Sequence, residues 1–258
     1  MSDAVDHHAE RPDASASDGV VAAWLASTTG QLLDELRSNT TQRSRYGWIE
    51  DVADRRGHEF LCEELGRIRP EDGLLSEEGT DDRSRLNHER VWIVDPLDGS
   101  NDYGYGAGDW AIHVALTEDG APTVGAVAVP AMGAVFSTHV APGEPESDRD
   151  RPLIVTGRSR VHSDGAMLSH ALDADLVTCG SAGVKAMLVV LGEVDAYVHS
   201  TPLYEWDVCA PAVVAQAAGL HVSDSDGRPL VFNQQRPVVP GFVVCRKELA
   251  EPILDALS

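Results

Sequence analysis

A four-residue apolar run, Val91-Trp92-Ile93-Val94, ends directly in the sequence Asp95-Pro96-Leu97-Asp98-Gly99-Ser100. So short a run, followed by proline and glycine, is typical of a buried strand that enters a turn rather than of a helix. Two carboxylates, three residues apart, therefore follow a rigid strand directly. Pro96 and Gly99 help to set a turn in which both carboxylates can converge on one point.

Carboxylates as close as Asp95 and Asp98 repel each other unless a cation lies between them. Oxygen ligands suit a hard ion, Mg²⁺ above all, which keeps several waters and is usually held by carboxylates and substrate phosphate. The backbone N–H groups of Gly99 and Ser100 would add anion donors if they open a helical turn. The same residues also fit an ordinary surface turn, so a metal site needs further acidic partners.

Two other acidic segments supply such partners. Ser76-Glu77-Glu78 follows a short extended piece at residues 73–75, and Trp206-Asp207 opens a predicted helix. Each has an ordinary alternative, a solvated acidic pair in the first case and a helix N-cap in the second. The coincidence of three separated acidic motifs favours a metal site.

The first half of the chain is predicted to pack helices on an antiparallel sheet. Helical spacing of apolar residues predicts an amphipathic helix over residues 19–37, with Asp18 as its N-cap, and a second helix over residues 52–68. Beyond the buried run, further strands are predicted at residues 111–116, 124–129 and 134–139.

The second half of the chain alternates strands with helices, which predicts an α/β lobe. The polar, proline-bearing segment 141–152 marks the predicted boundary, so we expect a disordered tail at 1–18, an N-terminal α+β lobe at 19–140 and a C-terminal lobe at 152–258. The predicted strands cover residues 153–156, 176–178, 196–199 and 242–245, and the predicted helices cover residues 164–172, 181–191, 207–218 and the C-terminus.

The formal net charge is -22, and Lys185 and Lys247 are the only lysines. This balance opposes nucleic-acid polymers and anionic membranes as partners, and it leaves a bound metal ion to receive an anionic substrate. The 4 cysteines form no metal-binding pair, which fits reduced thiols. With no apolar leader segment and no run long enough to span a membrane, we expect a cytoplasmic protein.

Taken in order, the segments Ser76-Glu77-Glu78, Asp95 to Ser100 and Trp206-Asp207-Val208-Cys209-Ala210 resemble the three signatures of the inositol monophosphatase superfamily of lithium-sensitive magnesium phosphatases. The resemblance runs from about Gly19 to the C-terminus, and it is strongest to bacterial 3′(2′),5′-bisphosphate nucleotidases of the CysQ type. It implies a layered αβαβα sandwich with α+β and α/β character, an active site between the lobes, and lithium inhibition. Family members are often dimers, so a homodimer is also expected.

The resemblance also implies a set of metal ligands for two or three Mg²⁺ ions. Glu77, Asp95 and the Leu97 carbonyl look like ligands of the first ion, and Asp95, Asp98 and Asp207 look like ligands of the second. Asp207 would also contact the substrate. In-line attack by an activated water on a small phosphorylated metabolite would follow, without a covalent phosphoenzyme.

Three residues are implied to act in catalysis: Asp54, Glu77 and Ser100. Asp54 stands where the family has a Thr-x-Ala-Asp element whose Asp binds a further metal and helps to activate water; here Glu50 or Asp51 replaces the Thr. Ser100 replaces the usual Thr of the central motif and keeps the hydroxyl that pairs with the Asp54 position. The amides of Gly99 and Ser100 would hold the phosphate.

The segment Gly180-Ser181-Ala182-Gly183-Val184-Lys185 matches the family's substrate loop. Ser181 and Lys185 are therefore expected to bind substrate, with Lys185 on a second phosphate, although a lysine on a solvated helix face is the ordinary alternative. The family's inositol-binding Glu is replaced near His199 or Ser200. Adenosine 3′,5′-bisphosphate is thus the expected substrate, with inositol 1-phosphate, fructose 1,6-bisphosphate or a catalytically silent ion- and nucleotide-binding protein as alternatives.

Overall fold

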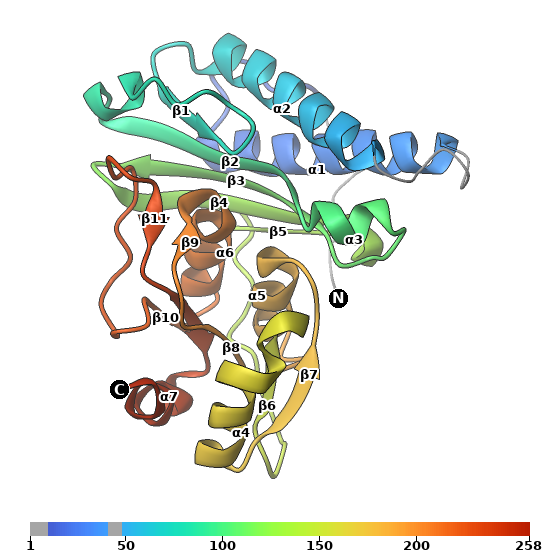
Figure 1. Ribbon diagram of the computed structural model, residues 1–258. Coiled ribbons are helices and arrows are strands. Elements are labelled where there is room, and N and C mark those ends of the chain that lie inside the picture. The colour runs from blue at the N-terminus through green and yellow to red at the C-terminus, as the bar shows by residue number, and fades with distance from the viewer. Residues whose placement is uncertain (1–9, 41–47) are drawn as a thin grey trace.

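Helices and sheets alternate in five layers in the computed structural model, which describes residues 10–40 and 48–258 (Figure 1). Helices α1 (Asp18–Asn39) and α2 (Ile49–Ile68) cover the first sheet. Helices α5 (Ala182–Val190) and α6 (Glu205–Ala217) lie between the first and second sheets. Helices α4 (Ala166–Leu172) and α7 (Ala250–Leu257) cover the outer face of the second sheet. The predicted αβαβα sandwich is confirmed.

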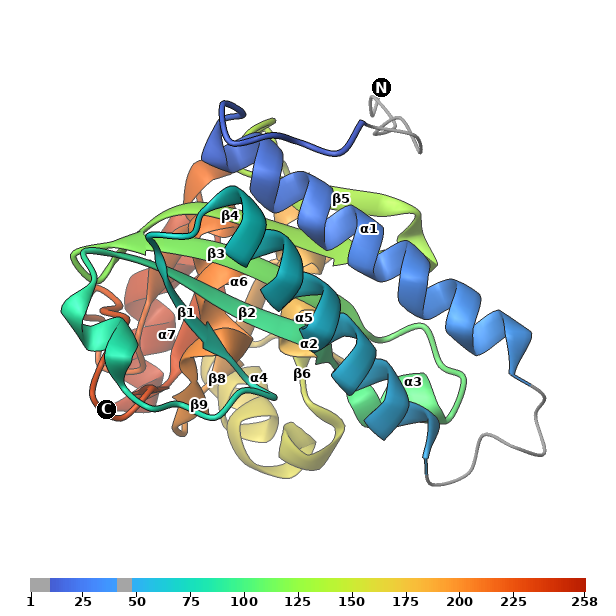
Figure 2. The ribbon, with the colours of Figure 1, turned by 90° about the horizontal axis from the view of Figure 1, so that it is seen from above.

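The N-terminal end of α1 differs by one residue from the prediction. Ser17, not Asp18, is the N-cap, and its Oγ accepts the N–H of Val20 at 3.4 Å. Asp18 instead accepts hydrogen bonds from Arg69 at 2.7 Å and from Arg90 at 3.1 Å, which tie α1 to α2 and to the first sheet. Both helices lie across the same face of that sheet (Figure 2).

Residues 10–17, which fall within the predicted disordered tail, pack against α2. Arg11 Nε donates to Glu64 at 2.8 Å, and Arg67 donates to the Pro12 carbonyl at 2.8 Å. These contacts are made by charged side chains, so hydrophobic patterning gave no sign of them. Residues 1–9 of the predicted tail lie outside the described residues.

The first sheet has the strand order β1-β2-β3-β4-β5. Strand β1 pairs with β2 in parallel, and the other pairs are antiparallel as predicted. β2 continues through the acidic motif instead of ending before it. The strands are β1 (Gly73–Ser76), β2 (Arg90–Asp98), β3 (Ala111–Glu118), β4 (Ala121–Val129) and β5 (Ala134–Ser137).

The second sheet has the strand order β10-β12-β8-β6-β7, with parallel pairs between β6 and its two neighbours. Sequence patterns missed β10 and a separate pair, β9 with β11, because strands of two or three residues carry no clear alternation. The strands are β6 (Leu153–Thr156), β7 (Asp175–Thr178), β8 (Ala196–His199), β9 (Leu203–Tyr204), β10 (His221–Ser223), β11 (Val238–Val239) and β12 (Phe242–Cys245).

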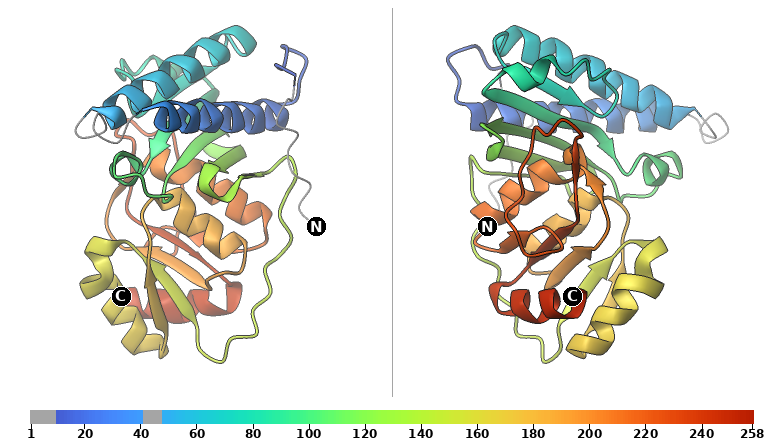
Figure 3. Two further views of the ribbon diagram at one scale, coloured as in Figure 1. Left: turned by 90° about the vertical axis from the view of Figure 1, so that its right-hand side faces the viewer. Right: turned by 60° about the vertical axis from the view of Figure 1, so that its left-hand side comes forward.

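Short helical segments complete the fold. They are α3 (Ser100–Gly104), a π-helical turn at Val161–Gly165 and 3₁₀ turns at Ser84–Asn87, Pro130–Met132, Arg158–Arg160 and Lys247–Leu249. Residues 138–152 run along the outside of the molecule from β5 to β6 (Figure 3). In the described ranges, no helix is long and apolar enough to cross a membrane.

One apolar core cluster joins the middle helices to both sheets. It includes Val127 of β4, Met187 of α5, Val208 of α6 and Val244 of β12. Gly125 of β4 lets α6 approach closely, because a Cβ at this position would collide with Val213 of α6. The division into lobes at residues 141–152 stays a prediction, since this core is shared across it.

Candidate active site

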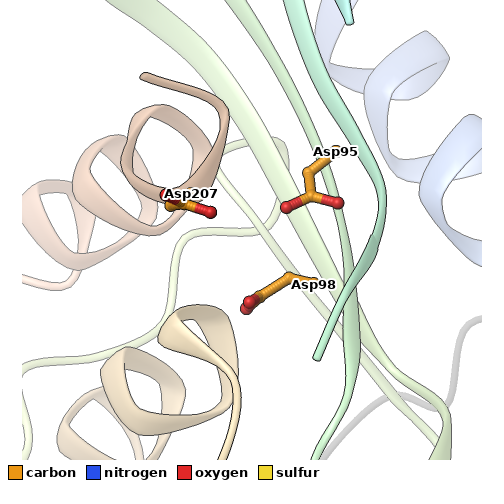
Figure 4. Close-up of side chains that lie close together, drawn as sticks. All are labelled: Asp95, Asp98 and Asp207. Carbon is orange, nitrogen blue, oxygen red and sulfur yellow. The ribbon is translucent and has the colours of Figure 1, made fainter. Parts of the chain in front are cut away.

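Three carboxylates, predicted from two separate motifs, converge at the junction of the first sheet and α6. Asp95 and Asp98 come from the C-terminal end of β2, and Asp207 lies in the first turn of α6. Their ligand oxygens all lie within 4.8 Å of one another, and the side chains point toward a common space (Figure 4). Oxygen ligands in this density are suited to a hard divalent cation.

The turn between Asp95 and Asp98 is built into β2 itself. The register with β3 shifts between these two residues, so the strand bulges and turns both carboxylates to the same side. Asp95 Oδ1 accepts the N–H of Leu97 at 2.9 Å, which fixes one oxygen of the carboxylate.

Gly99 follows with φ of 94°, and a Cβ there would lie 2.5 Å from the Asp109 carbonyl oxygen, so only glycine fits. Helix α3 then begins at Ser100. The condition set for Gly99 and Ser100, that they open a helical turn, is met, whereas their binding of phosphate stays a prediction.

Asp98 is held by groups from the start of α5 and from β3. Its Oδ2 accepts the Ser181 hydroxyl at 2.5 Å and the Gly183 N–H at 2.7 Å, and it lies 3.3 Å from His113 Nε2. Burial alone would raise the pKa of Asp98, but His113, Lys185 and Ser181 outweigh it and hold the pKa well below its usual range. Asp98 is therefore the anchored anion of the cluster.

Asp95 and Asp207 have the opposite tendency. Asp95 is 1% exposed, and its burial, followed by the charges of Glu77 and Asp98, raises its pKa well above the ordinary value. Burial and the charges of Asp98 and Glu77 raise the pKa of Asp207 to about 7. Burial and the neighbouring charges disfavour the ionised form of these carboxylates, so the pocket needs a bound proton or cation to neutralise them. These residues therefore suit a divalent ion.

Glu77 reaches the same region from β1. The parallel pairing of β1 with β2 places Ser76 beside Val94, and the Glu77 N–H donates to the Val94 carbonyl at 3.3 Å. Burial raises the pKa of Glu77; the hydrogen bond with Asp95 lowers it, and the charge of Asp98 raises it further, so the net shift is upward. Glu77 is thus a neighbour of Asp95, although it lies outside the group of three carboxylates.

Asp54 lies on α2 and faces the same acidic segment. Burial, then the charges of Glu78 and Glu77, raises its pKa to about 8. Glu50, one of the two residues in place of the expected Thr, has a buried Oε2 without a hydrogen-bond partner within residues 10–40 and 48–258. The roles of Asp54 in metal binding and of Ser100 in orienting water stay predictions.

The predicted substrate loop holds itself together. Ser181, with φ of 53°, caps α5, and its Oγ accepts the Val184 N–H at 3.0 Å while donating to Asp98. Lys185 is only 6% exposed, and its Nζ donates to the carbonyls of Gly180 at 3.2 Å and Ser181 at 2.5 Å. The ammonium also lies 5.0 Å from the ring centre of Tyr197. This geometry favours a role in holding the loop over contact with a second phosphate.

Two residues beside the cluster have roles that sequence patterns did not assign. His113 is fully buried on β3, and its Nδ1 lies 3.0 Å from the Trp206 carbonyl while Nε2 faces Asp98. Its only sequence signal was a lone polar residue within an apolar strand. Glu205 is buried and accepts the N–H groups of Asn233 at 2.7 Å and Gln234 at 2.8 Å. It therefore anchors the 233–234 loop.

An αβαβα sandwich that gathers carboxylates between its first sheet and α6 defines a metal-dependent phosphatase. The chain belongs to the inositol monophosphatase family, whose sequence model matches residues 20–258. Membership makes it a phosphoric monoester hydrolase and confirms the resemblance on which the sequence prediction depended.

Relatives within the family share most of the chain. It is 41% identical over 263 residues to the 3′-phosphoadenosine 5′-phosphate phosphatase of Mycobacterium leprae, covering 95% of this chain and 94% of the relative. It is 30% identical over 205 residues to the 3′(2′),5′-bisphosphate nucleotidase CysQ of Escherichia coli K12, covering 75% and 83%. The crystal structure of CysQ from Bacteroides thetaiotaomicron has the same fold, with a TM-score of 0.78 at 24% identity over 89% of this chain and 97% of that one.

Proposed function

We propose that the chain is a Mg²⁺-dependent 3′(2′),5′-bisphosphate nucleotidase that removes the 3′-phosphate of 3′-phosphoadenosine 5′-phosphate. The observation that carries the proposal is the convergence of Asp95, Asp98 and Asp207 within 4.8 Å. The substrate is supported by the 41% identity to a phosphatase named for this nucleotide, across 95% of the chain.

In this proposal the cluster holds two ions, and Asp54 holds a third. Glu77, Asp95 and the Leu97 carbonyl would bind one of the two, and Asp95, Asp98 and Asp207 would bind the other. Bound divalent ions would lower the pKa of a coordinated water and neutralise charge on the leaving oxygen.

The remaining residues would position Asp98, the attacking water and the phosphate. Ser181, Gly183 and His113 fix Asp98 through one oxygen, which leaves its other oxygen for a cation. The Ser100 hydroxyl and Asp54 would orient the attacking water, and the Gly99 and Ser100 amides would hold the phosphate.

Phosphate release from 3′-phosphoadenosine 5′-phosphate with and without Mg²⁺ tests the proposal directly. We expect turnover that disappears in excess EDTA and returns with Mg²⁺. LiCl is expected to inhibit it, whereas KCl at equal ionic strength is not. Higher kcat/KM for inositol 1-phosphate or fructose 1,6-bisphosphate than for the nucleotide would contradict the substrate assignment.

Lys185 and Arg158 are the two candidate side chains for binding a second phosphate of the substrate. Arg158 lies beside the substrate loop: its guanidinium pairs with Asp102 at 2.8 Å and with Asp109, which in turn accepts the Gly180 N–H at 3.1 Å. Its side chain is 52% exposed, whereas Lys185 is used internally.

We therefore expect Arg158→Ala to lower kcat/KM about tenfold for the bisphosphate and little for inositol 1-phosphate, the size expected for one charged hydrogen bond. Lys185→Ala should lower both values by similar factors, because it loosens the loop that holds Asp98. A loss confined to the bisphosphate in Lys185→Ala, with Arg158→Ala unaffected, would restore Lys185 as the phosphate ligand.

A cytoplasmic location and a homodimer also belong to this proposal. The location is supported by four free cysteines, three of them buried. The homodimer follows only from the family resemblance, and sedimentation velocity at micromolar concentration would check it.

A further inference from the structure

An exposed aromatic stack stands beside the metal-binding cluster. The rings of Tyr204 and Trp206 lie parallel, with centres 4.6 Å apart and planes inclined by 5°. Trp206 is partly buried and packs against the main core cluster, whereas Tyr204 is 53% exposed. One face of the Tyr204 ring is therefore covered by Trp206, and the exposed half of the side chain includes its other face.

Two backbone contacts place this stack close to the reaction centre. The Tyr204 N–H donates to Asp207 Oδ2 at 3.0 Å, and the Trp206 carbonyl lies 3.0 Å from His113 Nδ1, whose other nitrogen faces Asp98. The aromatic pair and Asp207 thus share one short segment at the start of α6, and His113 connects that segment to Asp98.

The backbone at the stack is fixed by contacts with a neighbouring strand and loop. Tyr204 lies on β9, where it pairs with Val238 of β11, and the Glu205 N–H donates to the Pro237 carbonyl at 3.0 Å. The buried Glu205 carboxylate holds the next loop through Asn233 and Gln234. A tyrosine fixed by its backbone on both sides loses little further freedom when a flat ligand stacks on it.

We propose that the free face of Tyr204 is the platform for the purine base of the nucleotide substrate, a proposal that rests on the proposed function. Base–aromatic stacking needs a flat π-face and no charge, so it suits a molecule whose net charge is -22 and whose substrate is itself an anion. The metal cluster would bind the phosphate that is cleaved, and the platform would distinguish nucleotides from sugar and inositol phosphates.

Tyr204→Ala tests the platform without touching the cluster, because the donor to Asp207 is the backbone N–H of residue 204 and not the side chain. We expect KM for 3′-phosphoadenosine 5′-phosphate to rise about tenfold to a hundredfold, the range for loss of one stacking contact, with kcat changed less than threefold. The kcat/KM for inositol 1-phosphate, which has no base, should change less than threefold.

Two further variants separate stacking from other causes. Tyr204→Phe keeps the ring and should restore KM to within about threefold of wild type, since stacking does not need the hydroxyl. Tyr105→Ala removes a tyrosine that is 80% exposed and lies outside the stack, and it should change neither substrate's KM more than twofold. Equal losses on both substrates in Tyr204→Ala would show a structural role and overturn the proposal.

Equilibrium binding keeps this result separate from failure of the proposed function. Adenosine 5′-monophosphate, titrated calorimetrically into the Mg²⁺-loaded protein, should bind wild type at least about tenfold more tightly than Tyr204→Ala. Equal affinities would overturn the platform whether or not the bisphosphate is hydrolysed. Tighter wild-type binding without hydrolysis of the bisphosphate would keep the platform and reject the proposed reaction.

Discussion

Asp95→Asn is expected to lower kcat for the nucleotide by at least about a thousandfold, because Asp95 is the carboxylate assigned to both ions. The substitution removes charge but little shape. An Asn side-chain oxygen can still accept the Leu97 N–H that Asp95 Oδ1 accepts at 2.9 Å. Steady-state assays over a range of Mg²⁺ concentrations would measure the loss, which saturating Mg²⁺ should only partly recover.

The same variant should be at least as stable as wild type in EDTA. Burial and neighbouring carboxylates raise the pKa of Asp95, so the neutral form is the one that the metal-free fold prefers, and Asn resembles that form. Asp119→Asn, in the exposed turn after β3, removes an equal charge elsewhere and should keep kcat within twofold. An Asp95→Asn enzyme with more than about a tenth of wild-type kcat would contradict the assignment.

Metal-free protein is expected to lose stability as the pH rises from about 4 to about 8, and Mg²⁺ should restore it most at the upper end. The folded-state pKa is about 7 for Asp207 and about 8 for Asp54, against an ordinary value of 3.8 for both. The folded state therefore binds these protons more tightly than the unfolded state does. Their stabilising effect is complete below pH 4 and is lost as the pH passes the folded pKa values.

Thermal melts in EDTA and in Mg²⁺ across this pH range would measure the effect. A pKa difference of 1 corresponds to about 1.4 kcal/mol, so the differences for Asp207 and Asp54 together correspond to at most about 10 kcal/mol. Asp207→Asn should flatten the metal-free profile. A melting temperature in EDTA that does not change between about pH 5 and about pH 8, or an equal increment from Mg²⁺ at both, would show that burial and the neighbouring charges do not raise the pKa values of these two carboxylates.

The parts of the site that the sequence predicted are those in which local chemistry and chain direction agree. A buried strand ending in Asp95 and Asp98, and a helix opening at Asp207, each follow from a few neighbouring residues, and the structure brings these three carboxylates together. Glu77 comes near them because β1 pairs in parallel with β2, a long-range pairing that no short pattern encodes. Only the order of the three motifs, interpreted through the family resemblance, indicated it.

What the sequence could not give was the direction of individual side chains. Lys185 turns back to the carbonyls of its own loop, and His113 points inward from a strand whose two faces are both covered. Ser17, and not the predicted Asp18, is the N-cap of α1, because the Asp18 carboxylate binds Arg69 and Arg90 instead. The position of the Asp18 side chain, for example, depends on a partner more than 50 residues away, Arg69.

The close contact between Gly125 and α6 couples the affinity for the cation to the packing of α6 on the first sheet. Asp207 is part of α6, whereas Asp95 and Asp98 are part of β2. Any shift of α6 against the first sheet therefore increases the distances between these ligands. Gly125→Ala, although distant in sequence from the three carboxylates, would push α6 away from the first sheet and lower the affinity for the ion.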